Sequence, residues 1–222
     1  RSLAMSAYSH ASAGMAVRTR PSGKLRAEIL RQATLTTSVR EEMWQLFRRY
    51  YDAVTHETFV ADLATKQDVI VLRDSGDGSV QGFSTLFVFD ERVDDEHVIA
   101  IFSGDTIIDD AYWGQQALQR AFLRYMVTQK LKNPRASLYW FLISKGFRTY
   151  LLLSRNFPSY WPRHDAPTPA RETKILDALS KALFPDAWKP ELGVLRFEEC
   201  AGKLKRGVAP IDLAMLAHED IA

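Results

Sequence analysis

Residues 109–122 read DDAYWGQQALQRAF, an acidic pair and two aromatic residues, then a glycine and a run with helical character. The first turn of a helix leaves backbone N–H groups without acceptors, and with the helix dipole these groups can bind a phosphate. Gly114 would let such a ligand approach the backbone closely. A plain strand-to-helix turn, in which the glycine relieves crowding, would give the same sequence. Both interpretations stay open on this stretch alone.

The acidic pair Asp109 and Asp110 does not suit an anion site. Carboxylates near the start of a helix are stabilised by its dipole and by free N–H groups. The sequence therefore predicts that these two residues cap the turn.

One strand, two helices and then three strands are expected before this turn. Ser38 and Glu41 form a capping box ahead of an apolar stripe, and Thr55 begins a second helix that ends near Lys66. Alternating apolar and polar residues predict strands, with a Gly-rich hairpin turn between Asp74 and Ser79. The expected strands cover residues 24–34, 67–74, 80–93 and 96–108.

A βαβ unit is expected after the turn. A helix over residues 113–132 is stopped by Asn133 and Pro134, and SLYWFLIS then predicts a central strand buried on both faces. The remaining expectations are helices over 147–157 and 173–184, a late strand within 192–204 and a tail at 207–222.

This order of elements resembles the GNAT superfamily of acyl-CoA-dependent N-acyltransferases, over roughly residues 25–157. Tyr112 and Gly114 match the family's pyrophosphate loop, Trp113 replaces its usual arginine, and Gln116 and Leu118 stand where small residues are usual. The resemblance implies an α/β fold with a mostly antiparallel mixed sheet, splayed fourth and fifth strands and flanking helices. It also implies that acetyl-CoA or a longer acyl-CoA is the co-substrate, bound by Ile107, Ile108, Trp113, Gly114, Gln115, Gln116, Ala117 and Leu118.

The candidate catalytic residues are Asp105 and Tyr150. Gly104 and Asp105 are residue types that strand interiors disfavour, so the sequence predicts a bulge there. The resemblance implies that Asp105 removes the amine proton through a water and that Tyr150 protonates the leaving thiolate. A solvent-facing Asp105 and a Tyr150 packed in the core are the alternatives. Glu96 and His97 are further candidates at the start of the same strand.

A segment of aromatic residues, arginines and prolines follows, SRNFPSYWPRH at residues 154–164. Such a composition is typical of a loop that closes over a substrate, and Arg155 or Arg163 could receive a carboxylate or the phosphates. We therefore take Arg155, Tyr160 and Arg163 as candidate substrate-binding residues. A solvated loop is the alternative.

Composition limits the possible partners, compartment and cofactors of the protein. The net charge of +2, from 29 Lys and Arg against 27 Asp and Glu, gives no basis for a nucleic-acid partner. The single cysteine, Cys200, excludes an internal disulfide and favours a reducing compartment, the cytoplasm. Five scattered histidines predict no metal site, and the longest apolar run, 138–153, is too interrupted for a membrane span.

The sequence thus predicts a leader at 1–23 and a single acyltransferase domain with a C-terminal extension at 24–222. The expected reaction moves an acyl group to an amine of a small molecule or a protein. Two alternatives stay open: a binding protein without catalysis, and an enzyme that takes a long acyl chain from an acyl carrier protein. The tail also leaves a homodimer open.

Overall fold

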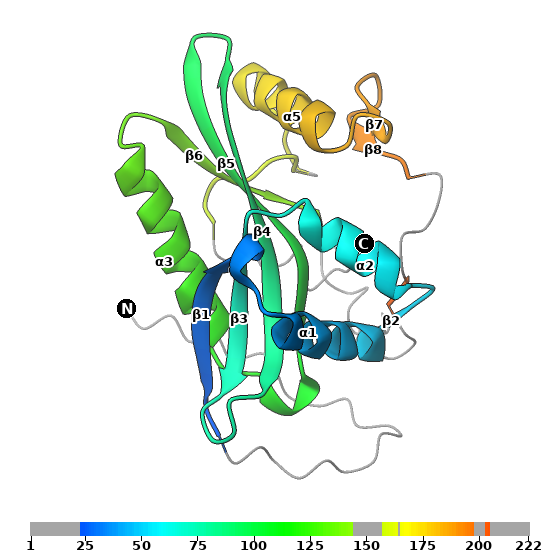
Figure 1. The fold of residues 1–222 in the computed structure, drawn as a ribbon. Helices are drawn as coiled ribbons and strands as arrows, with labels where there is room; N and C mark the ends of the chain where they lie inside the picture. Colours follow the sequence, from blue (N-terminus) through cyan, green and yellow to red (C-terminus); the bar gives the residue numbers. More distant parts are fainter. Residues whose placement is uncertain (1–22, 144–156, 164, 198–202, 205–222) are drawn as a thin grey trace.

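The computed structural model describes residues 23–143, 157–163, 165–197 and 203–204. A five-stranded mixed sheet in the order β1-β3-β4-β5-β6 forms its centre, with α3 on one face and α1 and α2 on the other (Figure 1). The fold class expected from the sequence is therefore confirmed. The sheet strands are β1 (Leu25–Arg31), β3 (Asp68–Asp74), β4 (Val80–Val93), β5 (Glu96–Ile108) and β6 (Ser137–Leu142).

The helices lie close to where the apolar periodicity predicts them, and they are α1 (Thr37–Tyr50), α2 (His56–Ala64), α3 (Ala117–Lys132) and α5 (Ala170–Leu183). Thr55 caps α2 as expected, since its side chain accepts the N–H of Thr58. The prediction of Ser38 as the cap of α1 is wrong. Thr36 fills that position and accepts the N–H of Val39, because the helix begins two residues earlier than the capping box suggests.

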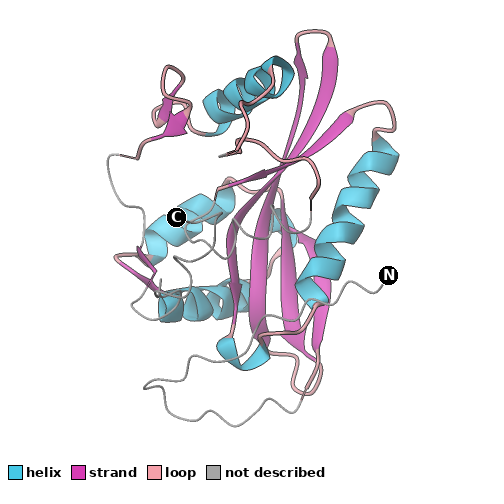
Figure 2. Cartoon of the chain, turned by 180° about the vertical axis from the view of Figure 1, so that it is seen from behind, coloured by secondary structure: helices cyan, strands magenta, loops and turns pink. Residues whose placement is uncertain are grey.

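Two hydrophobic clusters cover the two faces of the sheet. Ile70 and Ile101 belong to the cluster beneath α3, and Val71 and Ile107 belong to the cluster beneath α1 and α2. A third cluster joins α5 to the far parts of β4, β5 and β6, and it contains Phe89, Val98, Ala100, Phe141, Ile175 and Leu179. Figure 2 shows the same layers from behind.

β1, β3, β4 and β5 are antiparallel neighbours, whereas β5 and β6 are parallel, so β5, α3 and β6 form the expected βαβ unit. The prediction that β6 is central and buried on both faces is wrong. Among the described strands it pairs only with β5 and ends the sheet, and most of its residues are half-buried. Aromatic neighbours, not a second flanking strand, account for its apolar sequence.

Two pairings of short, two-residue strands take the place of the late strand. β7 (Trp188–Lys189) pairs with β8 (Val194–Leu195), and β9 (Lys203–Leu204) pairs with β2 (Tyr51–Asp52). Apart from Gly23 and Phe157, the expected leader (1–23), the helix at 147–157 and the tail (207–222) lie outside the described residues. None of the described helices is long and apolar enough to cross a bilayer.

Candidate active site

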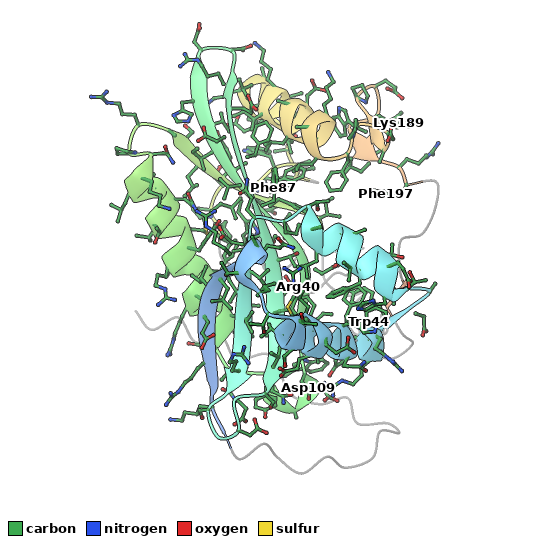
Figure 3. The ribbon with its side chains drawn as sticks, viewed as in Figure 1. Arg40, Trp44, Phe87, Asp109, Lys189 and Phe197 are labelled. Atoms are coloured by element: carbon green, nitrogen blue, oxygen red, sulfur yellow. The ribbon has the colours of Figure 1, made fainter. Side chains whose placement is uncertain are left out.

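The loop between β5 and α3 is fixed by Asp109, which is fully buried. Its carboxylate accepts the N–H of Ala111 at 3.1 Å, and it forms an ion pair with Arg49 of α1 at 2.8 Å. These bonds hold the 3-10 turn η2 (Asp110–Tyr112) against α1. Figure 3 labels Asp109 at the end of the molecule opposite Lys189. Asp109 therefore caps this turn, as the sequence predicts.

Asp110 is held by Tyr50, whose hydroxyl accepts the backbone N–H of Asp110 at 2.8 Å. Burial raises the pKa of Tyr50 to about 12. A second tyrosine in the turn, Tyr112, donates its O–H to Asp74 over 2.6 Å. The turn is thus anchored to α1 on one side and to β3 on the other.

The helix that follows begins at Ala117, four residues later than the sequence predicts. Gly114 adopts a φ of +90°, and Trp113 before it is extended, so neither can belong to the helix. A Cβ on Gly114 would meet nothing within 4 Å. The glycine is therefore required for its left-handed backbone and does not relieve crowding.

Among the described residues, no side chain caps the first turn of α3. Gln116 is the N-cap residue, but its side chain makes no capping hydrogen bond. Gln115 instead accepts the N–H of Leu25 at 2.8 Å and ties the loop to β1. Residues 111–118 contain no acidic side chain that would repel an anion. The uncapped helix start, the positive end of the helix dipole and the open approach at Gly114 together suit a diphosphate.

The bulge expected in β5 is present. Ser84 pairs with Thr106 and Leu86 pairs with Ser103, so Gly104 and Asp105 together oppose the single residue Thr85. A β-bulge of this kind shifts the alternation of side chains along a strand.

The change of face is visible in the core. Ile101 packs beneath α3, whereas Ile107, an even number of residues later, packs beneath α1 and α2. Ser84 and Thr106 share a hydrogen bond of 2.8 Å on the α3 face. The bulge therefore shifts the alternation of side chains by one residue: odd-numbered residues of β5 face α3 before it, and even-numbered residues face α3 after it.

Asp105 lies near Tyr51 as a result. Burial raises the pKa of Tyr51 to about 12, and the negative charge of Asp105 adds to that rise. Tyr51 is buried and stacks on Phe47 with ring centroids 4.6 Å apart, so it belongs to the α1 and α2 face. Asp105 is half-buried beside it.

The pairing of β5 with β6 stops at the same place. Six residue pairs run from Val98 with Ser137 to Ser103 with Leu142, and the bulge begins at the next residue of β5. From Gly104 to Ile108, β5 therefore has no partner in β6 among the described residues. β6 ends at Leu142 and the described segment ends at residue 143, so the separation of the fourth and fifth strands that the resemblance implies stays a prediction.

Two residues at the bulge were not predicted from the sequence. Thr85 is 2% exposed, and its Oγ1 has no hydrogen-bond partner among the described residues. The side chain of Lys66 is only 9% exposed, and its ammonium donates to Asp62 at 2.7 Å. A Cβ on Gly104 would lie 2.5 Å from Thr85 Oγ1 and 3.2 Å from Lys66 Cε. A polar residue within the apolar run FSTLF is the only sequence signal for Thr85.

The aromatic segment reaches the same region from β6. Trp140 donates its indole N–H to Ser103 Oγ over 2.9 Å and contacts Phe157 at a centroid distance of 5.6 Å. Arg163 is bound to Asp165 and lies 5.2 Å from the ring centroid of Tyr160. Its guanidinium is therefore already engaged by a carboxylate. Tyr150 and Arg155 lie outside the described residues.

The other candidates are separate from this region. Glu96 accepts from Arg171 of α5, and His97 contacts Asp90 at 2.7 Å across the β4–β5 hairpin. Both lie at the opposite end of β5 from the bulge. In the part of the chain that is described, no group of three His, Cys, Asp or Glu side chains could hold a metal ion.

No protein-family model and no curated protein matches the sequence. Among solved structures, the chain is similar to an acetyltransferase from Trypanosoma brucei, with 12% identity, 65% of this chain and 100% of that chain covered, and a TM-score of 0.41. It is also similar to glucosamine-6-phosphate N-acetyltransferase from Arabidopsis thaliana, with 12% identity, 64% of this chain and 99% of that chain covered, and a TM-score of 0.43. For ribosomal-protein-alanine N-acetyltransferase from Brucella melitensis biovar Abortus 2308, the identity is 11%, the coverage is 65% of this chain and 99% of that chain, and the TM-score is 0.45. At these identities and TM-scores the likenesses carry no argument about activity, which has to be inferred from the residues of this chain.

Proposed function

We propose that the protein transfers an acyl group from a CoA thioester to an amine. The observation that carries this proposal is the half-buried carboxylate of Asp105, placed in the bulge of β5 directly after its last residue pair with the described part of β6. The resemblance implies that the acyl-pantetheine chain inserts between these two strands, and a carboxylate at that position can act on a group brought to it. The uncapped start of α3 lies at the end of the same strand and suits the diphosphate of CoA.

Two proton transfers are needed in this reaction. As the amine nitrogen bonds to the carbonyl carbon, the nitrogen must lose a proton, and Asp105 would accept it through a water. As the C–S bond breaks, the thiolate must gain a proton, and Tyr150 would donate it. Tyr160 and Arg163 would lie along the acceptor, with Arg163 shaping the loop through Asp165 because its charge is already paired.

The acceptor is an amine of a small molecule or a protein, and the acyl chain is acetyl or longer. An acyl-carrier-protein thioester is a second candidate donor. Arg120 and Arg124 follow the loop directly on α3, and carrier proteins are acidic.

Thermal unfolding of the full chain with a panel of acyl-CoA thioesters tests the proposal. A ligand present at about 100 times its dissociation constant adds ~2.7 kcal/mol to the free energy of unfolding, so a clear rise in Tm is expected. No rise with any thioester, in a chain that unfolds cooperatively, would contradict CoA as the donor.

A charge variant locates the site. Gln116→Glu puts a carboxylate at the start of α3, where it favours the helix but repels a diphosphate. We expect this variant to keep its own Tm and to lose the response to acyl-CoA. Thr128→Glu adds the same charge at an exposed position three turns further along α3 and should respond as the unaltered chain does. An equal response in Gln116→Glu would move the cofactor site away from the loop.

A further inference from the structure

The outer side of α3 carries a row of aliphatic side chains. Leu123, Val127 and Leu131 are 61%, 49% and 75% exposed, and they recur every four residues. At a rise of about 1.5 Å per residue they are about 6 Å apart along one side of the helix. We call these three residues the α3 stripe. The opposite side of α3 packs on the sheet through Ala121 and Tyr125, so the helix has a second apolar side that packing leaves uncovered.

No described element covers the α3 stripe. In Figures 1 and 2, α3 lies at the edge of the molecule, and neither view places a described helix or strand on its outer side. Exposed aliphatic residues that line up in this way are characteristic of interaction surfaces, whereas scattered ones need no explanation.

The charges around the α3 stripe are all positive. The charged residues of α3 are Arg120, Arg124, Lys130 and Lys132, and the helix contains no acidic residue. This charge distribution extends along the chain, because none of the 27 Asp and Glu lies within residues 111–164, whereas nine of the 29 Lys and Arg do. The remainder of the chain is therefore net acidic, and the positive charge of the protein is concentrated in this segment.

The residue types of the α3 stripe and its neighbours favour one class of partner over the others. A second copy of the same face would bring like charges together. Nucleic acid gains from cations and aromatic rings but not from a row of aliphatic residues. Protein interfaces favour aromatic residues and disfavour lysine, whereas the α3 stripe is aliphatic and has lysines beside it. Leucine and valine flanked by Lys and Arg on one helix is the composition of helices that lie on anionic bilayers.

We propose that α3 docks the protein on an anionic lipid surface, with the α3 stripe facing the acyl chains. Arg120 and Arg124 are exposed, and each lies three residues before a member of the α3 stripe, so they extend their charge outward to the lipid phosphates. The bilayer is contacted from one side only, which agrees with the lack of a spanning helix among the described residues. This inference goes beyond the acyl transfer proposed above and does not depend on it.

Co-sedimentation of the full chain with lipid vesicles tests the proposal. Vesicles of phosphatidylcholine mixed with phosphatidylglycerol should bind the protein, and pure phosphatidylcholine vesicles should bind it weakly. Two variants are compared: Leu123→Ser with Leu131→Ser, and Arg120→Gln with Arg124→Gln. Each should lower the vesicle partition coefficient by roughly tenfold or more, and high salt should reproduce the effect of the charge variant.

The matched control removes equally exposed aliphatic residues from another surface. Leu192 and Val194, near the short β7–β8 pairing, are 60% and 46% exposed. Leu192→Ser with Val194→Ser should leave vesicle binding unchanged. All substituted side chains are exposed, and circular dichroism of each variant verifies that it is folded.

Three results would overturn the proposal. The first is that the unaltered chain does not sediment with anionic vesicles. The second is equal binding by the α3-stripe variants and the control. The third is that the chain binds an acidic acyl carrier protein, or forms a dimer in sedimentation velocity, through the α3 stripe while vesicles leave it unbound.

Discussion

Arg49 forms an ion pair at 2.8 Å with Asp109, whose side chain is fully buried while that of Arg49 is 42% exposed. The pair connects the last turn of α1 to the loop that precedes α3. Arg49→Met removes the countercharge that Arg49 supplies to the buried carboxylate, so we expect a loss of about 2 kcal/mol in the free energy of unfolding. Urea unfolding measures it. Arg26→Met, at an exposed position of β1, should change stability by no more than about 0.5 kcal/mol. Equal losses in the two variants would mean that the buried carboxylate does not need Arg49.

Asp105→Asn tests the proposed base. The amide cannot accept the amine proton, so kcat/KM should fall by roughly 10²–10⁴ while the dissociation constant for acyl-CoA stays the same. The pH profile of the residual activity should also lose its acidic limb. Asp90→Asn, at the far end of the β4–β5 hairpin, is the control. An activity unchanged in Asp105→Asn would remove this residue from the mechanism.

Gly104→Ala should destabilise the bulge. The new Cβ would lie 2.5 Å from Thr85 Oγ1, and we expect a cost of about 2 kcal/mol from overpacking. Thr85→Ala removes the crowding atom, whose hydroxyl has no partner among the described residues. In a double-mutant cycle measured by urea unfolding, the two substitutions should therefore compensate each other in part. Strictly additive changes in the free energy of unfolding would contradict a contact between the new Cβ and Thr85 Oγ1.

Buried tyrosines should make the protein sensitive to alkaline pH. Burial raises the pKa of Tyr50 and of Tyr51 to about 12, and burial with the hydrogen bond to Asp74 raises that of Tyr112 to about 12. In the unfolded chain these groups lose their protons near the ordinary tyrosine pKa of about 10. Above that pH the folded state holds more protons than the unfolded state, so stability is intact below pH about 10 and falls as pH rises to about 12.

Urea unfolding at a series of alkaline pH values measures this fall. Tyr112→Phe removes one of the three groups and should make the fall with pH shallower. Identical slopes in the unaltered chain and in Tyr112→Phe would contradict a linkage through Tyr112.

Local patterns were sufficient to predict most elements, because helices and hairpins depend on neighbours in sequence. The bulge was also predictable, since Gly104 and Asp105 are both unfavourable within a strand. The start of α3 was not, because a positive φ at Gly114 cannot be distinguished in the sequence from a glycine inside the first helical turn.

Features that depend on distant segments were not predictable. The edge position of β6 is decided by which strands pair, and the burial of Thr85 and Lys66 is decided by the bulge on another strand. A reducing compartment, inferred from the single Cys200, and a homodimer through the tail stay predictions.

The change in which β5 side chains face each core, which occurs at the bulge, links the stability of the protein to its proposed site. Before the bulge, odd-numbered residues such as Ile101 fill the core beneath α3, and after it Ile107 fills the core on the other face. If β5 kept all its residues but continued as a regular strand without the bulge, Thr106 would be directed into the apolar core beneath α1 and α2, and Ile107 out of it. Folding therefore selects against a regular strand, and the bulge that places Asp105 is retained by the packing of residues other than Asp105.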